Sequence, residues 1–285
     1  IGELIIERSG VINVAIEGMM LIAASVGFIT AFYTESLFIG CIAALLIAGL
    51  IGVLHAFMSV YLKGHQIIIG LGLLIFCTGL SALVYRIFIG IRVVAPKIPV
   101  LQRVDIPLLS KIPYVGSIFF SQPVLVYLAY VLVPIVAIVL FRTPLGLRLR
   151  ACGENPRAID SLGINVYKFR FYAIVTGSSI IGLAGFFLPA VLTGSFSDGM
   201  VGGRGWLSLQ LVIFGRWIPK YVLVGSLLFA YIESMQYRLA MITKAIPSQF
   251  FLMLPYLSAI VIIVFVYKRS EAPLSFMKPY DREKR

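Results

Sequence analysis

The sequence predicts an all-α membrane protein, a polytopic helix bundle that forms a single domain over residues 1–285. Hydrophobic residues make up 60% of the chain and charged residues only 13%. The mean hydropathy of +1.00 exceeds what a soluble domain can hide from water. The apolar residues also lie in long runs without β-barrel alternation, which leaves helices as the spanning structure.

A helix that crosses a bilayer needs about 20 predominantly apolar residues. The eight runs that we assign as spans are residues 12–33, 37–62, 66–88, 122–141, 171–193, 201–218, 221–239 and 248–267. In the sixth run the dense apolar part, residues 206–214, is too short to cross alone, so we expect a broken or half helix there. Because the chain begins with Ile1 rather than Met, we expect that sequence precedes it and can hold a further span.

The basic residues indicate the orientation. If the N-terminus faces the cytoplasm, most of the 24 lysines and arginines fall on the cytoplasmic side, in the loop 142–170 and the tail 268–285 above all. Five bases in the segment 86–111 lie on the outer side, against this bias. The net charge of +12 therefore reflects loop asymmetry, and we predict no nucleic-acid partner. The three cysteines are far apart and predict neither a metal site nor a disulfide.

The loop 142–170 has the pattern of a capped short helix. Asn155 can cap the free amide groups of a first turn, and Pro156 suits the first helical position. A short helix over 157–162 then ends at Gly163, which can adopt the left-handed conformation. A second, longer element is expected over 164–170.

Two interpretations of this loop remain open. It is either a solvated connector whose basic ends are held by anionic lipid, or a docking helix that receives mechanical work from a soluble partner. In the second case Ala158 and Gly163 allow close approach, and Glu154 and Arg157 fix the register of docking.

Four stretches of the sequence carry motifs in a consistent order. They are residues 7–20 (Glu-Arg-Ser-Gly-Val-Ile-Asn-Val-Ala-Ile-Glu-Gly-Met-Met), 153–158 (Gly-Glu-Asn-Pro-Arg-Ala) with 163–166, 203–209 (Gly-Arg-Gly-Trp-Leu-Ser-Leu) with 212–219, and the tail 272–283. Together they resemble the permease subunits of ABC importers for branched-chain amino acids, simple sugars and nucleosides, and most closely the nucleoside branch. Ile159 departs from the pattern, because that branch often has a small residue there.

The resemblance implies a division of labour in a bacterial cytoplasmic (inner) membrane. Such permeases pair in the bilayer, here as a heterodimer with a sister permease, and an extracytoplasmic lipoprotein delivers the substrate. ATP and Mg²⁺ belong to a partner ATPase, and this chain has no phosphate-binding loop and no catalytic constellation, so it is not an enzyme. The ATPase-docking residues implied are Gly153, Glu154, Asn155, Pro156, Arg157, Ala158, Asp160, Gly163 and Ile164.

The substrate pathway needs polar groups inside an apolar wall, and Glu17 is the first candidate. An ionised side chain at that depth usually faces a bundle interior, a cavity or a partner. Asn13 lies four residues earlier on the same helical face, and the resemblance suggests a discontinuous helix here. Alternatively, Glu17 pairs structurally with Arg8 or lies at the interface.

Further pathway candidates are Gln66 and Thr78 in the third span, although the glycines between them favour helix packing. Ser178, Gly182 and Gly185 form a small-residue stripe for helix association in the fifth span. Alternatively, Ser178 faces the lumen together with Thr176 and Ser179. The candidates around the sixth run are Arg204, Trp206, Ser208 and Gln210. Trp206 beside Arg204 is either a membrane anchor or a surface that stacks a nucleobase.

The segment 89–121 is the outer loop. Its prolines at 96, 99, 107 and 113 prevent one continuous helix. We expect an irregular cap on the outer surface, which serves either as a docking place for a binding protein or as a structural lid.

Three function classes were compared. An ABC permease for a nucleoside explains the docking loop, the missing ATP motifs and the four ordered stretches, and a permease for a simple sugar such as ribose is the alternative. An ion-coupled secondary transporter predicts internal repeats and more intramembrane carboxylates than Glu17 and Glu233. A membrane-embedded enzyme needs clustered His, Asp or Glu, which the sequence lacks.

Overall fold

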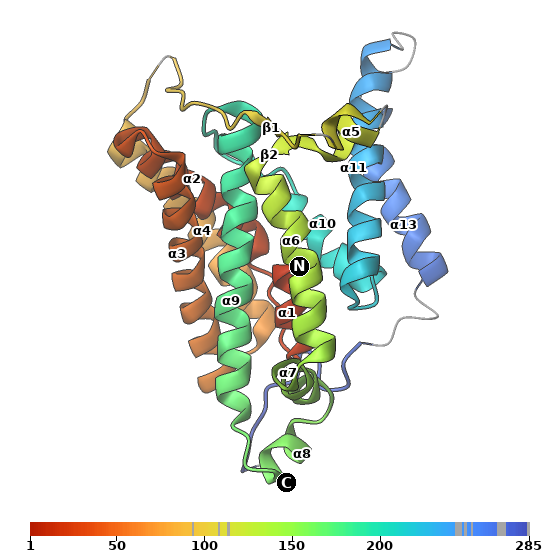
Figure 1. Cartoon of the computed structure of the whole chain (residues 1–285). Coiled ribbons are helices and arrows are strands. Elements are labelled where there is room, and N and C mark those ends of the chain that lie inside the picture. Colours follow the sequence, from red (N-terminus) through yellow and green to blue (C-terminus); the bar gives the residue numbers. More distant parts are fainter. Residues whose placement is uncertain are drawn as a thin grey trace.

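The computed structural model describes residues 1–92, 94–107, 109–112, 115–242, 247, 250–251, 253–266 and 272–283. Long helices run roughly side by side through the molecule (Figure 1). Two short helices, α7 (Pro144–Glu154) and α8 (Pro156–Ser161), lie at one end, which we call the α8 end. A two-stranded antiparallel sheet, β1 (Arg103–Asp105) with β2 (Ser121–Pro123), lies at the other, the sheet end.

The other elements follow in chain order. They are α1 (Gly2–Arg8), α2 (Ile16–Thr34), α3 (Leu37–Ala56) with a π-helical turn (Phe57–Tyr61), α4 (Gln66–Ile89), a 3-10 turn (Leu109–Lys111), α5 (Val115–Phe119), α6 (Val124–Arg142), α9 (Val166–Phe187) with a π-helical turn (Leu188–Thr193), α10 (Arg204–Phe214), α11 (Pro219–Ile242) and α13 (Leu254–Val266).

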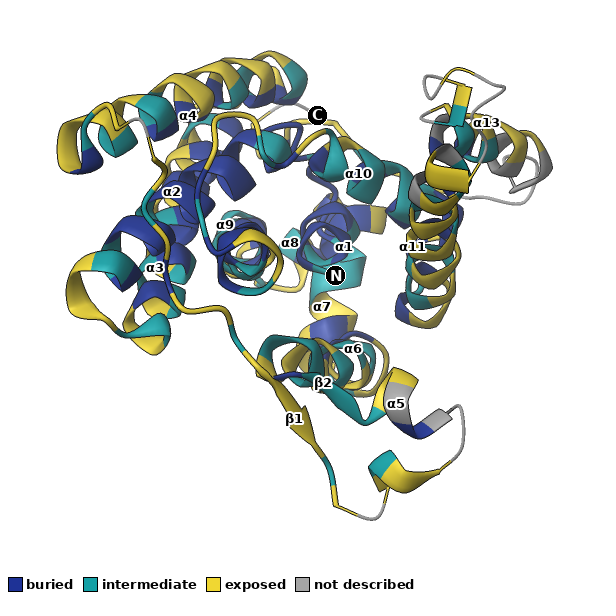
Figure 2. Cartoon of the chain, turned by 90° about the horizontal axis from the view of Figure 1, so that it is seen from above, coloured by how far each residue is buried: buried dark blue, intermediate teal, exposed yellow. Residues whose placement is uncertain are grey.

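The core forms around α2, which α3, α4 and α9 surround (Figure 2). Small residues bring these backbones into contact. A Cβ added at Gly182 would lie 2.4 Å from the carbonyl oxygen of Ala44, and one at Gly185 would lie 2.2 Å from that of Met20. The predicted small-residue stripe in the fifth span is therefore confirmed as a packing surface.

The outward faces of the long helices are apolar and exposed (Figure 2). Of the most apolar 18 residues of α6, only 11% are buried inside the protein, whereas 72% of the corresponding residues of α2 are buried. Such faces suit a lipid environment, and the chain is a multi-pass membrane protein.

Within the described residues, five helices are long and apolar enough to cross a bilayer: α2, α3 with its π turn, α4, α6 and α9 with its π turn. The predicted count of eight spans is not confirmed. Helix α10 has 11 residues, which is a rise of about 16 Å and too short to cross, as expected for the sixth run. The predicted span 248–267 lies partly outside the described residues, and α13 has 13 residues.

The first predicted span, 12–33, corresponds to α2, and a break separates this helix from the short helix α1. Helix α1 ends at Arg8 and α2 begins at Ile16, so residues 9–15 form a break between two helices. Helix α1 is buried on most of its surface and lies inside the bundle rather than outside it (Figure 2). The discontinuous helix that the family resemblance implied is therefore present.

The expected packing role of the glycines in α4 is confirmed for one of the three. Gly70 does contact Val14, but an added Cβ at Gly72 or Gly79 would meet nothing within 4 Å. These two glycines lie on the outward face of α4, so packing against other described helices of this chain does not explain them.

The segment 89–121 forms short elements in place of one helix, as its prolines predict. The antiparallel register pairs Arg103 with Pro123 and Asp105 with Ser121. Backbone hydrogen bonds from Ile98 to Gly194 and from Leu101 to Ala190 fix the segment to the end of α9. Pro113 lies outside the described residues.

We predict that Gly185→Ala lowers the free energy of unfolding by about 1–3 kcal/mol, because the new methyl group would overlap a backbone carbonyl that cannot rotate away. Gly72→Ala on the open face of α4 is the matched control and should not destabilise the protein. Thermal unfolding of both variants in detergent measures the difference. Equal melting temperatures would contradict the described packing of α9 on α2.

Candidate functional site

Helix α8 is capped as the sequence predicts. The Asn155 side chain accepts a hydrogen bond from the backbone N–H of Ala158 at 3.1 Å, and Pro156 occupies the first helical position. At the other end Gly163 has a φ of +78°, and the N–H of Ile164 donates to the carbonyl of Ile159 at 3.3 Å. A left-handed residue at this position terminates a helix at little cost when it is glycine.

The expected second element over 164–170 is not separate. Asn165 caps α9 by accepting from the N–H of Lys168 at 3.1 Å, and α9 then continues into the fifth span. Propagating an existing helix adds one hydrogen bond for each residue fixed, which is why this end of the loop merges with the span.

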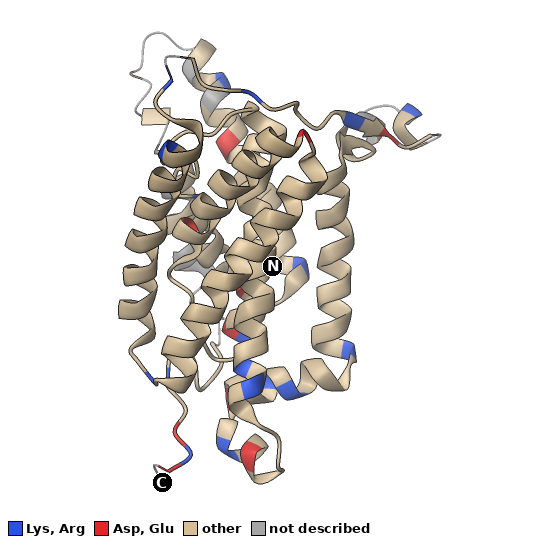
Figure 3. Cartoon of the chain, turned by 90° about the vertical axis from the view of Figure 1, so that its left-hand side faces the viewer, with Lys and Arg blue, Asp and Glu red and all other residues tan. Residues whose placement is uncertain are grey.

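Helix α7 occupies the first part of the loop and lies across the end of α6. Thr143 caps it by accepting from Gly146, and Arg150 donates to the carbonyl of Leu140 at 3.0 Å. The guanidinium of Arg150 also lies 4.8 Å from the ring centre of Phe141. Figure 3 shows Lys and Arg residues gathered around this part of the molecule.

The C-terminal tail runs along α7 and α8. The Ser275 N–H donates to the carbonyl of Gly153 at 2.9 Å, and the Leu274 N–H donates to the carboxylate of Glu154 at 3.2 Å. Arg282 forms a 2.8 Å ion pair with Asp160. Of the predicted docking residues, Gly153, Glu154 and Asp160 are therefore engaged by the tail. Burial, followed by the hydrogen bond with Asp160, raises the pKa of Tyr280 in the same cluster.

The other predicted docking residues divide between surface and core. Arg157, Ala158 and Gly163 are exposed and Ile164 is half-buried, whereas Pro156 is buried. Ile159 packs inward with Cys152 and Tyr280. The exposed surface of α8 and its two ends includes Asn155, Arg157, Ala158, Ser161, Leu162 and Gly163.

The docking loop also contacts the break in the first span. A Cβ at Gly153 would lie 2.4 Å from the carbonyl oxygen of Arg8, so only glycine allows this approach. The Met277 N–H donates to the carbonyl of Gly10 at 3.1 Å. The end of α7, the break and the tail meet at one place.

Glu17 lies on the other side of the break, at the start of α2. Its two carboxylate oxygens each accept a 2.7 Å hydrogen bond, one from the N–H of Gly203 and one from that of Gly205. These amides open α10, where the helix dipole favours negative charge. The alternative pairing with Arg8 is not formed, because the Arg8 side chain donates to the carbonyl of Trp217 at 2.8 Å.

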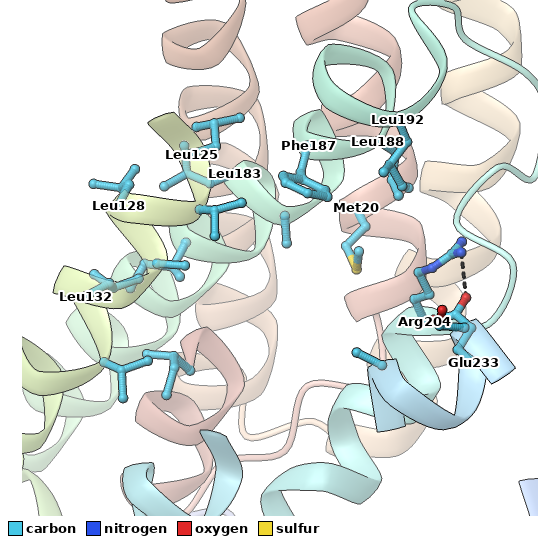
Figure 4. Close-up of a pocket in the computed structure, with 18 residues that line it drawn as sticks. Met20, Leu125, Leu128, Leu132, Leu183, Phe187, Leu188, Leu192, Arg204 and Glu233 are labelled. Carbon is cyan, nitrogen blue, oxygen red and sulfur yellow. Dashed lines mark hydrogen bonds and ion pairs between the residues drawn. The ribbon is translucent and has the colours of Figure 1, made fainter. Parts of the chain in front are cut away.

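Arg204 follows directly and forms a 2.7 Å ion pair with Glu233 of α11. The pair lies on the wall of a cavity of 780 Å³ between α6, α9 and α11 (Figure 4). The rest of that wall is mostly leucine, isoleucine, valine and phenylalanine. A second cavity of 430 Å³, between α10, α11 and α13, shares Arg204 and Glu233. The ion pair is thus a polar point common to two cavities.

Asn13 does not line either cavity. It is fully buried, its side-chain oxygen accepts from the N–H of Ala15 at 3.1 Å, and its amide nitrogen lies 3.4 Å from the sulfur of Met19. Its backbone N–H donates to the carboxylate of Glu3 at 3.0 Å. Asn13 therefore supports the turn into α2.

The remaining predicted pathway residues are dispersed. Gln66 is buried and accepts from the N–H of Ile12 at 3.0 Å, and Thr78 is exposed with its hydroxyl bonded to its own helix. Trp206 is 40% exposed, and the Ser208 hydroxyl donates to the carbonyl of Gly205. The side-chain oxygen of Gln210 has no hydrogen-bond partner among the described residues.

Sequence reasoning missed the buried polar face of α1. Glu3 and Glu7 lie one turn apart and are 2% and 0% exposed. The indole N–H of Trp217 donates to the Glu7 carboxylate at 2.5 Å, so α1 is tied to the turn after α10. The spacing of four residues between two carboxylates in an apolar helix was the available signal.

The fold and this arrangement define a class: a multi-pass helical membrane protein with a capped surface helix, next to which α7 contacts the break before α2. A family model described as the permease component of branched-chain amino acid transport systems matches residues 1–266. The chain belongs to this family and is an ABC transporter permease.

Three relatives match nearly the whole chain. The putative glucose ABC transporter permease protein TsgC13 of Haloferax volcanii is 32% identical over 99% of this chain and 93% of its own. The nucleoside ABC transporter permease protein NupC of Lactococcus lactis is 34% identical over 96% and 89%. The guanosine ABC transporter permease protein NupQ of Bacillus subtilis is 31% identical over 100% and 92%. No solved structure gives a significant match.

We predict that Glu17→Gln weakens the junction between α2 and α10. An amide has one oxygen acceptor, so one of the two backbone N–H groups faces a donor and loses a charge-assisted hydrogen bond worth about 1.5–3 kcal/mol. Chemical unfolding in detergent measures the loss. Glu35→Gln, at an exposed position, is the control, and equal stability of the two variants would contradict the junction.

Proposed function

We propose that this chain is a membrane-spanning subunit of an ABC importer that carries a nucleoside across a bacterial cytoplasmic membrane. The carrying observation is the capped helix α8, exposed at one end of the bundle and directly preceded by α7, whose Gly153 contacts the break before α2. Two of the three relatives, NupC and NupQ, are named for nucleoside or guanosine transport.

The energy for transport comes from a partner. The α8 end faces the cytoplasm, an ABC ATPase subunit that holds ATP and Mg²⁺ docks on α8, and its closure moves the break. A second permease subunit completes the membrane part as a heterodimer, and a substrate-binding lipoprotein delivers the solute at the sheet end. The exposed face of α8 around Arg157 and Ala158, on a rigid capped helix, supports this assignment.

The solute passes beside the Arg204–Glu233 pair. An uncharged, hydroxyl-rich solute needs hydrogen-bond partners on its way through an apolar wall, and this ion pair supplies donors and acceptors to both cavities. The amides that open α10 are held by Glu17, so the position of this pair depends on the first span.

A sugar is the second candidate substrate. TsgC13, which matches over 99% of this chain, is named as a putative glucose permease. Sugars and nucleosides share a hydroxyl-bearing ring, and the same polar point suits both. The nucleobase is what distinguishes them, because only the nucleoside adds an aromatic surface.

We predict that unlabelled adenosine or guanosine suppresses uptake of a labelled nucleoside by vesicles that contain the whole importer, whereas ribose and glucose do not. The transported solute is then recognised through its base as well as its hydroxyls. Uptake of labelled glucose that nucleosides leave unchanged would assign the importer to sugars instead.

We also predict that Ala158→Trp reduces copurification of the ATPase subunit by about tenfold, the equivalent of 1.4 kcal/mol, because a bulky ring on the exposed face of α8 prevents close approach. Ile68→Trp, which places the same ring on an exposed apolar position of α4, is the control. Unchanged copurification of the Ala158 variant would contradict docking on α8.

A further inference from the structure

The C-terminal tail makes ordered contacts with three separate parts of the chain. We call residues 274–282 the strap. Besides Ser275 on Gly153 and Met277 on Gly10, the strap forms the Arg282–Asp160 ion pair with α8. It also forms a 2.7 Å ion pair between Asp281 and Lys63, in the turn before α4. These contacts link α8, the break in the first span and the turn before α4.

Arg170 lies where these parts converge. Its guanidinium donates to the carbonyls of Ser9 at 3.1 Å, Lys278 at 3.0 Å and Cys152 at 3.3 Å. The three acceptors belong to the break, the strap and the end of α7. The side chain is 2% exposed, so these backbone oxygens replace water around a buried charge.

The geometry around Arg170 depends on arginine and on glycine. A planar guanidinium presents five donors in a fixed fork, whereas the ammonium of lysine is a compact point charge on a flexible stem. Gly10 has a φ of +91°, and a Cβ there would lie 2.8 Å from the Arg170 guanidinium. A side chain at position 10 would therefore collide with the guanidinium, and glycine allows the break to lie this close to it.

We propose that the strap is part of the coupling machinery, and that Arg170 is the positioning residue that makes the strap, the end of α7 and the break move as one body. This inference rests on the proposed function, because it concerns how work received at α8 reaches the pathway. Displacement of α8 then moves the break directly, and the break leads within a few residues to Glu17 and the start of α10. Without the strap, α8 would keep its chain connections and the packing of Ile159 on Cys152, but it would lose the ion pair of Asp160 with Arg282.

The test uses the whole importer in vesicles and measures solute moved per ATP hydrolysed, together with copurification of the ATPase. Arg170→Met and Arg170→Lys should lower the solute-to-ATP ratio at least about fivefold while the ATPase still copurifies, because docking is intact and transmission is lost. Lys168→Met, an exposed position on the first turn of the same helix, is the matched control and should keep the wild-type ratio.

The ion pair between the strap and α8 gives a second test that leaves Arg170 unchanged. Arg282→Asp alone and Asp160→Arg alone place like charges together and should lower the ratio, whereas the exchange of both restores it. If the Arg170 variants fail to fold, this series of charge variants still tests whether the strap couples α8 to the break.

The outcomes distinguish a failure of the proposed function from a failure of the role assigned to the strap. Wild-type vesicles that hydrolyse ATP without moving any solute would overturn the proposed function itself. A wild type that transports, with folded Arg170 variants at the wild-type ratio, would overturn the role of the strap. Single charge variants at the wild-type ratio, or an exchange that restores nothing, would overturn it equally.

Discussion

A spanning helix that stops inside a membrane protein leaves backbone groups with no partner in the next turn, and this constraint governs the structure around residues 9–15. Lipid offers no hydrogen bonds, so each freed N–H and C=O must find a partner in the protein. The N–H of Ile12 donates to Gln66, and that of Asn13 donates to Glu3. The carbonyls of Ser9 and Gly10 accept from Arg170 and Met277.

Each of these partners comes from a different part of the chain, which makes the break a meeting point. Arg170 brings α9, Met277 brings the tail and Gln66 brings α4. On the far side of the break, Glu17 brings the first turn of α10, where Arg204 begins the ion pair that two cavities share. A break in a helix costs free energy when its backbone groups have no partners. Here the break at residues 9–15 connects the region of α8 with the Arg204–Glu233 ion pair inside the bundle.

Local features were predictable from the sequence and distant pairings were not. The cap at Asn155, the stop at Gly163, the short α10 and the small-residue stripe of α9 all follow from rules that act within a few residues. The partners of Glu17 lie 186 and 188 residues away, and no local pattern announces them. Asn13 was assigned to one helical face with Glu17, but it lies in the break before α2. Thr78 was assigned by polarity, which does not distinguish a side chain bonded to its own helix from one that faces a cavity.

The most direct measurement of the joint between α8, the break and the strap is a pair of distances in the complete importer, with and without ATP, between spin labels on exposed residues. Labels at Ser161 and Leu274 report on α8 and the strap, and labels at Ser161 and Ser197 report on α8 and the segment before α10. The first distance should stay constant and the second should change on ATP binding. A first distance that changes while the second stays constant would contradict a joint that moves as one body.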